Sequence, residues 1–155
     1  MSVEEPQNDM GPLRKSVTVG KPVEQAFSLF TAGLARWWPL GQYSVSQERA
    51  ITCVMEPRVD GSLYELRDDG ERFLWGRVLV WDPPHRVVFS WHPGRDAETA
   101  QEVEIRFSAQ GHSTQVDLEH RDWAKLGDRA RETREGYEKG WDVVLGQHFL
   151  GACRE

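Results

Sequence analysis

The chain has 155 residues, of which 39% are hydrophobic and 28% are charged, and its formal net charge is −6. This length and composition predict one globular domain with an ordinary core and exclude a wholly disordered chain. Lys and Arg are scattered and outnumbered by acidic residues, so no basic surface of the kind that binds nucleic acid is expected.

The ends of the chain and its cysteines bear on where the protein works. No apolar run approaches the roughly 20 residues of a membrane helix, and residues 1–12 lack the apolar segment of a signal peptide. Cys53 and Cys153 have no metal-type spacing and are expected to be reduced thiols, with one long-range disulfide as the alternative. We therefore expect a cytoplasmic protein without a membrane or nucleic-acid partner.

The chain divides into a short tail and one domain. Residues 1–12 are polar and without periodicity, which predicts a flexible tail, and residues 13–155 are predicted to form a single domain. Alternation of apolar and polar residues over 13–19 predicts a first strand.

Two short helices are expected after this strand. Pro22 suits the first turn of a helix, and apolar residues at helical spacing continue that helix to Phe30. A second helix should end at Trp37-Trp38-Pro39, because proline pushes the residue before it out of the helical conformation.

The middle of the chain predicts an antiparallel sheet. Six segments with strand-type patterns are separated by Gly, Pro and Asp turn signals, at 51–56, 62–67, 72–81, 85–91, 102–109 and 114–121. In the last segment Val116, Leu118 and His120 share one face. One side of the sheet should therefore be buried and the other solvated.

The C-terminal segment predicts a long amphipathic helix. Its apolar stripe consists of Tyr137, Trp141, Val144, Leu145, His148 and Ala152. A stripe of this kind must pack on another surface, and the sheet offers the large one available. The order of elements predicts an α+β fold in which a curved antiparallel sheet of six to seven strands wraps around this helix.

Several segments resemble those of a known family. They are VEQAFSLFT followed by WWP, then EPRVDGSLYEL, then GRVLVWDPPHRVVFSW, together with His120, Trp123 and Gly140-Trp141. Over residues 13–152 the chain is similar to single-domain proteins related to the C-terminal domain of the activator of the heat-shock-protein-ninety ATPase. These belong to the SRPBCC (START-like) superfamily, and the resemblance implies a helix-grip fold.

The resemblance also carries expectations about function. It implies a cavity between the sheet and the last helix that takes an apolar small molecule. Asp60 departs from the pattern, which usually has a Gly-Gly pair there, and the separate N-terminal domain that eukaryotic activators use against the chaperone has no counterpart. A chaperone partner is therefore an alternative that the sequence itself does not support.

We expect this cavity to be lined by side chains from the hairpin, the helices and the facing strands. The expected set is Trp38, Tyr64, Val78, Val80, Phe89, Trp91, Phe107, Leu118, Trp141, Leu145 and His148. In the hairpin at 73–94, Trp75 and Trp81 should then face outward, where they would suit a homodimer interface. The alternative is that the aromatic side chains simply fill the core, and a one-residue slip of register would exchange the two faces.

Groups suited to catalysis are few. His148 on the helical stripe could act as an acid or base near neutral pH, or be a hydrogen-bonded core residue, and His120 is more typical of the latter. The five histidines lack metal-binding spacing, so neither a metal nor another cofactor is expected. No motif of a nucleophile elbow or a nucleotide-binding loop occurs.

Two main hypotheses follow. The first is a binding protein for an apolar or aromatic small molecule. The second is an enzyme of the polyketide cyclase or hydrolase type, with His148, Tyr64 and Arg77 as candidate residues. A chaperone-associated stress-response protein is a third.

Overall fold

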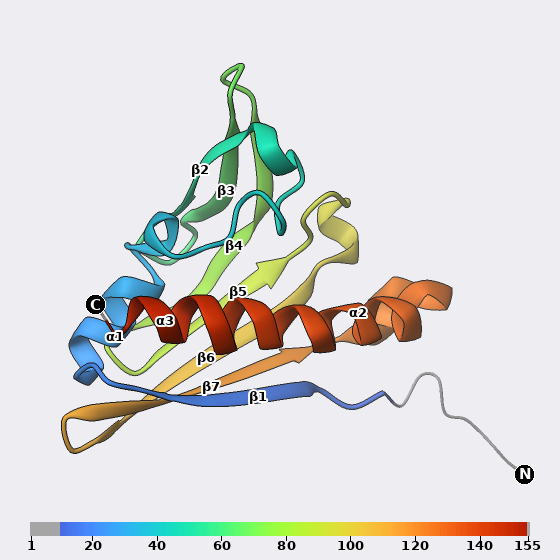
Figure 1. Cartoon of the computed structure of the whole chain (residues 1–155). Helices are drawn as coiled ribbons and strands as arrows, with labels where there is room; N and C mark the ends of the chain where they lie inside the picture. Colours follow the sequence, from blue (N-terminus) through green and yellow to red (C-terminus); the bar gives the residue numbers. More distant parts are fainter. Residues whose placement is uncertain (1–9, 155) are drawn as a thin grey trace, which may run out of the picture.

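The computed structural model describes residues 10–154 and shows a seven-stranded antiparallel sheet curved against a long C-terminal helix (Figure 1). The strands are β1 (Leu13–Val19), β2 (Ala50–Met55), β3 (Ser62–Arg67), β4 (Arg72–Asp82), β5 (Arg86–Trp91), β6 (Gln101–Gln110) and β7 (Ser113–Arg121). Their order across the sheet is β1-β7-β6-β5-β4-β3-β2. The predicted α+β helix-grip fold is confirmed.

Helical segments cover one face of this sheet and join its strands. Four short ones lie between strands, namely α1 (Val23–Phe30) and the 3₁₀ turns η2 (Leu34–Arg36), η3 (Gln47–Arg49) and η4 (Ala97–Thr99). The C-terminal run consists of η5 (Trp123–Arg129), α2 (Ala130–Val143), the π-helical turn η6 (Val144–Phe149) and α3 (Leu150–Ala152). The long helix crosses the sheet from the end of β7 to the C-terminus (Figure 1).

The first helix is held by its apolar face. Phe27 and Phe30 are buried, and their rings lie 5.2 and 5.9 Å from the ring of Phe107 on β6. The hydroxyl of Thr31 donates to the carbonyl of Phe27 at 2.7 Å and so satisfies one carbonyl of the last turn. Helix α1 is thereby anchored on the inner face of the sheet.

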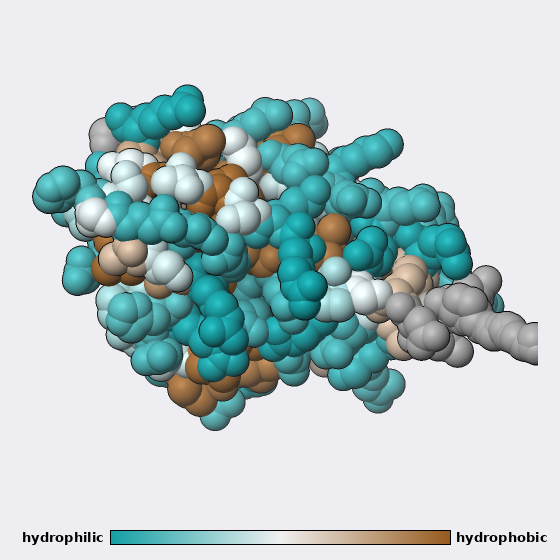
Figure 2. All heavy atoms as spheres, turned by 90° about the horizontal axis from the view of Figure 1, so that it is seen from below, coloured by the Kyte–Doolittle hydropathy of each residue, from teal (hydrophilic) through white to brown (hydrophobic). Residues whose placement is uncertain are grey.

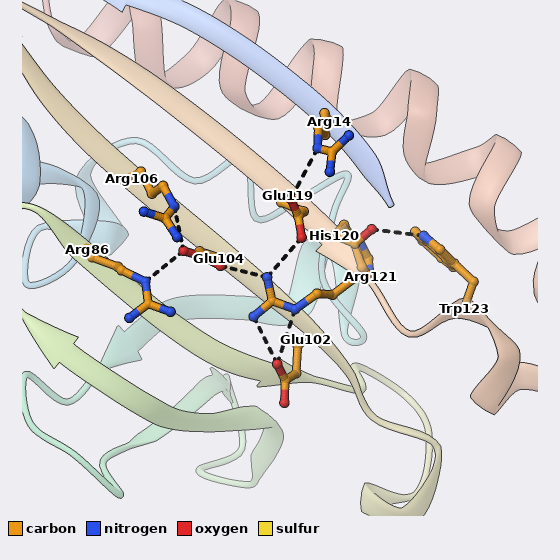
Figure 3. Close-up of polar contacts among 9 residues, drawn as sticks. All are labelled: Arg14, Arg86, Glu102, Glu104, Arg106, Glu119, His120, Arg121 and Trp123. Atoms are coloured by element: carbon orange, nitrogen blue, oxygen red, sulfur yellow. Dashed lines mark hydrogen bonds and ion pairs between the residues drawn. The ribbon is translucent and has the colours of Figure 1, made fainter. Parts of the chain in front are cut away.

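Strands β6 and β7 show the predicted alternation. Val103, Ile105, Val116 and Leu118 are at most 1% exposed and face the helix, with Phe107 beside them. The residues between them point to the opposite face, where charged side chains form a network (Figure 3). The face seen in Figure 2 is mostly hydrophilic, with apolar side chains showing only in small patches.

Two irregularities in β4 overturn part of the hairpin prediction. The pairing shifts by one residue between Leu63 and Tyr64 opposite β4, and again between Val78 and Val80. Each bulge exchanges the faces for the residues beyond it. Trp75, expected to face outward, is 1% exposed in the core, because it is the extra residue of the first bulge.

The second bulge changes the orientation of the following pair. Trp81, also expected outside, is half-buried and its ring lies 5.1 Å from that of Phe27. Val80, expected inside, pairs with Val88, which in turn pairs with Glu104 of the outer network. The expectation that Val80 faces the helix was therefore wrong, since strict alternation does not hold across a bulge.

A π-helical turn alters the stripe of the last helix. From Val144 to Phe149 the helix widens, so that Phe149, at 0% exposed, takes the inward position expected for His148. His148 is exposed. An α-helical period of 3.6 residues places residues 141 and 148 on one face, whereas a π turn shifts that face by about one residue.

The beginning of the described chain lies along the last helix. Residues 1–9 of the predicted tail lie outside the described residues, and Arg134 donates to the carbonyls of Gly11 and Pro12 at 3.1 and 3.2 Å. Within residues 10–154, no helix combines the length and apolar character needed to cross a membrane.

Candidate functional site

An apolar cavity of about 500 Å³ lies between helix α2, the end of β5 and the loop before η3. This volume is within the range of about 300–1,000 Å³ that is usual for small-molecule pockets. The lining residues are Trp38, Tyr43, Ser44, Val45, Trp91, Pro93, Gly94, Thr133, Gly136, Tyr137, Gly140, Trp141 and Val144.

Three indole rings form the inner wall of the cavity. The ring centroids of Trp38, Trp91 and Trp141 lie 5.8 to 6.1 Å from one another. Trp75 supports this wall from behind, at 5.2 Å from Trp38 and 5.6 Å from Trp91. These spacings are typical of favourable tilted aromatic pairs, so the wall is a packed unit.

The N–H group of each of these three indoles is already bonded within the protein. Trp38 donates to the carbonyl of Tyr43 at 2.7 Å, Trp91 to the hydroxyl of Tyr137 at 2.9 Å, and Trp141 to Nδ1 of His120 at 3.0 Å. The rings therefore offer carbon faces to the cavity, and the polar edge of each ring is occupied.

On the helix side of the cavity, two of the lining residues are glycines, which leave open volume because they have no side chain. A Cβ atom on Gly136 would meet nothing within 4 Å, and one on Gly140 would lie 3.5 Å from the ring of Tyr43. No close helix–sheet approach requires glycine at Gly136. Glycine at this position costs about 1 kcal/mol of helix stability relative to Ala, and it leaves free volume in the cavity where a side chain would otherwise lie.

The outer lip of the cavity is fixed by a buried carboxylate. Glu65 on β3 is 0% exposed, and it accepts hydrogen bonds from the backbone N–H groups of Val45 and Ser46 at 2.7 Å each. The Trp75 indole donates to the same carboxylate at 2.6 Å. Glu65 thus joins the lip to the indole wall. The sequence signal for this role is an acidic residue at an inward-facing strand position.

At the inner end of the cavity, Trp141 belongs to a chain of hydrogen bonds between neutral groups. Because an indole N–H can only donate, Trp141 makes Nδ1 of His120 the acceptor, and Nε2–H then donates to Oε1 of Gln101 at 3.2 Å. The Gln101 amide donates onward to the carbonyl of Thr99 at 2.7 Å. His120 is therefore satisfied as a neutral ring.

The ionisation of His120 fits this arrangement. Burial, followed by the positive charges of Arg95 and Arg134, lowers the pKa of His120 to about 3. The lowered pKa favours the neutral ring. In that form His120 accepts from the Trp141 indole and so orients Trp141.

Tyr137 brings a hydroxyl to the cavity wall. Its oxygen accepts from the Trp91 indole, and none of the hydrogen bonds found within residues 10–154 uses its own proton. Burial raises the pKa of Tyr137, while the Trp91 hydrogen bond and the charge of Arg95 oppose that rise. The phenol is thus protonated at neutral pH and can donate to a bound molecule.

The predicted site residues separate into three groups. Trp38, Trp91 and Trp141 line the cavity. Five others are at most 2% exposed within the core: Val78, Phe89, Phe107, Leu118 and Leu145.

The third group lies away from the cavity and comprises Tyr64, Val80 and His148. Tyr64 lies between the inward Leu63 and Glu65, so alternation turns it to the outer face, where Arg72 stacks 4.6 Å from its ring centroid. Arg77, suggested for an anion, is exposed on β4.

Some lining residues were not among those predicted. Tyr137 precedes Trp141 by one turn on the predicted stripe, and Gly136 and Gly140 are four residues apart on one helix face. These helical spacings can be read from the sequence. The loop residues Tyr43 to Val45 show no comparable sequence pattern, because the position of a loop depends on what the loop packs against.

Both cysteines are buried thiols without a disulfide. Burial and the charge of Glu65 raise the pKa of Cys53 to about 12, and burial raises that of Cys153 to about 11. Across the part of the chain that the structure describes, no group of three or more His, Cys, Asp or Glu residues is arranged to hold a metal ion.

Comparison with protein families agrees with this fold. The family described as "Activator of Hsp90 ATPase homolog 1-like protein" matches residues 21–149. The chain belongs to this family. Helix α1, all strands from β2 to β7 and the cavity lie within the matched part.

Two solved structures are similar in sequence as well as in fold. The anthrahydroquino-γ-pyrone synthase Txn09, solved complexed with SUM, is 31% identical, with 93% of this chain and 97% of that chain covered and a TM-score of 0.63. CalC, a self-sacrificing resistance protein from Micromonospora echinospora, is 28% identical, with 92% and 94% covered and a TM-score of 0.70.

A third structure shares the fold alone. The Aha1 dimer from Colwellia psychrerythraea is 16% identical, with 88% and 91% covered and a TM-score of 0.63. No curated protein matched the chain. The predicted homodimer interface loses its stated basis, because Trp75 is buried and Trp81 packs on Phe27.

Proposed function

We propose that this family member binds a planar aromatic small molecule in the cavity walled by Trp38, Trp91 and Trp141. The observation that carries the proposal is the apolar cavity itself, whose indole N–H groups are all bonded within the protein. Flat carbon faces favour flat aromatic ligands, since stacked or edge-on ring pairs add about 0.5–1.5 kcal/mol beyond area burial. Gly136 keeps the helix side open.

The similar structures support an aromatic ligand. The name of Txn09, the 31% identical relative, specifies an anthrahydroquino-γ-pyrone, which is a fused aromatic ring system. The match to Txn09 covers 93% of this chain and 97% of that chain. The ligand of the present chain is proposed to be of the same general shape.

A synthase or cyclase activity is the second candidate. It is favoured by the likeness to Txn09 and by the Tyr137 hydroxyl, a protonated donor at the cavity wall. Native mass spectrometry of the purified protein with a recovered ligand separates the two candidates. A binding protein returns the ligand with its mass unchanged, whereas an enzyme converts it to a different mass.

Binding is tested with a neutral probe, anthraquinone-2-carboxamide. Titration should quench tryptophan fluorescence saturably at one probe per chain, with a Kd in the micromolar range, about −8 kcal/mol. Gly136→Leu should weaken binding at least tenfold by filling the cavity. Gly146→Leu is the matched control, because Gly146 also has open space around it but does not line the cavity. Absence of saturable binding, or equal weakening by both variants, contradicts the proposal.

A further inference from the structure

Next to the cavity, but not among its lining residues, is an arginine that forms no ion pair within residues 10–154. Arg95 follows Pro93 and Gly94, which line the cavity. Its Nη2 makes a long hydrogen bond, 3.4 Å to Oε1 of Gln101, the guanidinium also interacts with the Tyr137 hydroxyl and opposes the rise of the Tyr137 pKa, and Nη1 is buried without a hydrogen-bond partner. Buried polar groups are nearly always satisfied, so this nitrogen calls for an explanation.

The backbone around Arg95 is held firmly. The N–H of Arg95 donates to the carbonyl of His92 at 2.9 Å, and the carbonyl of Arg95 lies 3.1 Å from Nδ1 of the buried His92. Gly94 has a φ of +74°, a conformation that other residues rarely adopt. The turn thus presents the Arg95 side chain at a set place beside the cavity while leaving the guanidinium loosely bonded.

The side-chain contacts of Arg95 are with neutral groups. They are the Gln101 amide and the Tyr137 hydroxyl, and none of the ion pairs within residues 10–154 includes Arg95. Arg121, in contrast, contacts three carboxylates within 3.1 Å on the other face of the sheet. A partly buried charge without a partner is costly, and an anionic ligand group offsets that cost.

We propose that Arg95 and Tyr137 form an acidic-group subsite of the aromatic cavity, which takes a carboxylate on the ligand. The guanidinium supplies a positive charge next to the cavity, and the Tyr137 hydroxyl supplies a hydrogen-bond donor from the cavity wall. The inference rests on the proposed function, because the aromatic part of the ligand occupies the indole wall. It narrows the ligand to a planar aromatic acid.

The test compares anthraquinone-2-carboxylate with the isosteric anthraquinone-2-carboxamide on the full chain by calorimetry. The carboxylate should bind about tenfold or more tightly. Arg95→Gln should reduce the ratio of carboxylate to carboxamide affinity to about one. Arg131→Gln, an equal loss of charge at an exposed position outside the cavity, should keep the preference.

The outcomes separate the two proposals. If both probes bind the natural chain equally well, the proposed acidic-group subsite is wrong, but the proposal that the cavity binds an aromatic molecule stands. If neither probe binds, both proposals are wrong. A preference that survives in Arg95→Gln also overturns the subsite. Should Arg95→Gln fail to fold, Arg95→Lys must keep part of the preference for the carboxylate over the carboxamide, and Tyr137→Phe must reduce that preference.

Discussion

Strands β6 and β7 carry polar side chains on both faces. On one face these side chains form ion pairs, and on the other they form hydrogen bonds between neutral groups. On the outer face Glu104 accepts ion pairs from Arg86 and Arg106 at 2.7 Å each and from Arg121 at 2.6 Å (Figure 3). On the inner face the neighbouring residues His120 and Gln101 form a chain of neutral hydrogen bonds. Both clusters come from the same alternating sequence.

The two clusters differ in how completely their charges are paired within the protein. In the outer network every carboxylate meets an arginine, and Arg121 also reaches Glu102 and Glu119 (Figure 3). The charges of the outer network are paired within the protein, so this network links neighbouring strands. On the inner side, Arg95 forms no ion pair with a carboxylate, and the cavity lies next to it. This unpaired charge beside an apolar cavity is the basis of the proposed subsite.

Acid should weaken the inner cluster before the outer network. The pKa of His120 is about 3 in the folded chain against 6.5 otherwise, so the unfolded state takes up the proton first. The free energy of unfolding is unaffected above pH 6.5 and falls by roughly 1.4 kcal/mol per pH unit below it, about 2.5–3 kcal/mol by pH 4.5. Urea unfolding at a series of pH values measures the slope.

The same series in His120→Gln supplies the control. The variant should lose the slope between pH 6.5 and 4.5, and an unchanged slope would assign it to other groups. Glu104 acts only at lower pH: burial opposes its ionisation, but hydrogen bonds from Arg121 and Arg86 outweigh burial and lower its pKa below 4.5. Its stabilisation is present above pH 4.5 and is lost as the pH falls further.

Glu104→Gln should destabilise the chain by about 2–3 kcal/mol without changing probe affinity. The substitution leaves three arginines without their shared carboxylate, but their side chains are 24–62% exposed, so the cost stays below that of a fully buried pair. Denaturant unfolding gives the loss, with Glu102→Gln as a control expected to cost about 0.5–1 kcal/mol. Equal losses in the two variants would mean that Glu104 is not the centre of the network.

Two Arg→Gln substitutions compare the faces directly. Arg121→Gln should cost about 1.5–2 kcal/mol, because charged hydrogen bonds to three carboxylates are lost. Arg95→Gln should change the free energy of unfolding by less than about 0.5 kcal/mol, since no ion pair is lost. Thermal unfolding of both variants at pH 7.5 checks the contrast, and a larger loss at Arg95 would mark that residue as structural.

His148→Ala should have the smallest effect. The side chain is exposed and outside the cavity, so stability should change by less than about 0.5 kcal/mol and carboxamide affinity by less than twofold. Fluorescence titration and denaturant unfolding measure both. A tenfold loss of affinity would return His148 to the binding site.

Local periodicity in the sequence was enough for most of the fold. The bounds of β1 and β3 agree with the predicted segments, and the inward faces of β6 and β7 follow from strict alternation. The same alternation placed His120 inside. A period of two or 3.6 residues depends only on the backbone of one element, which is why the sequence contains it.

Tertiary structure alone decided the cavity and its polar end. The bulges of β4 turned Trp75 inward, and the π turn exchanged His148 for Phe149, because pairing and packing with distant residues overrode each local period. The positions of Arg95 and of the loop at Tyr43 follow from contacts across the fold, through Gln101 and Trp38. The amino-acid sequence by itself determined a helix-grip sheet rich in indoles, and three-dimensional packing determined which indoles line a cavity and which charge beside it lacks a partner.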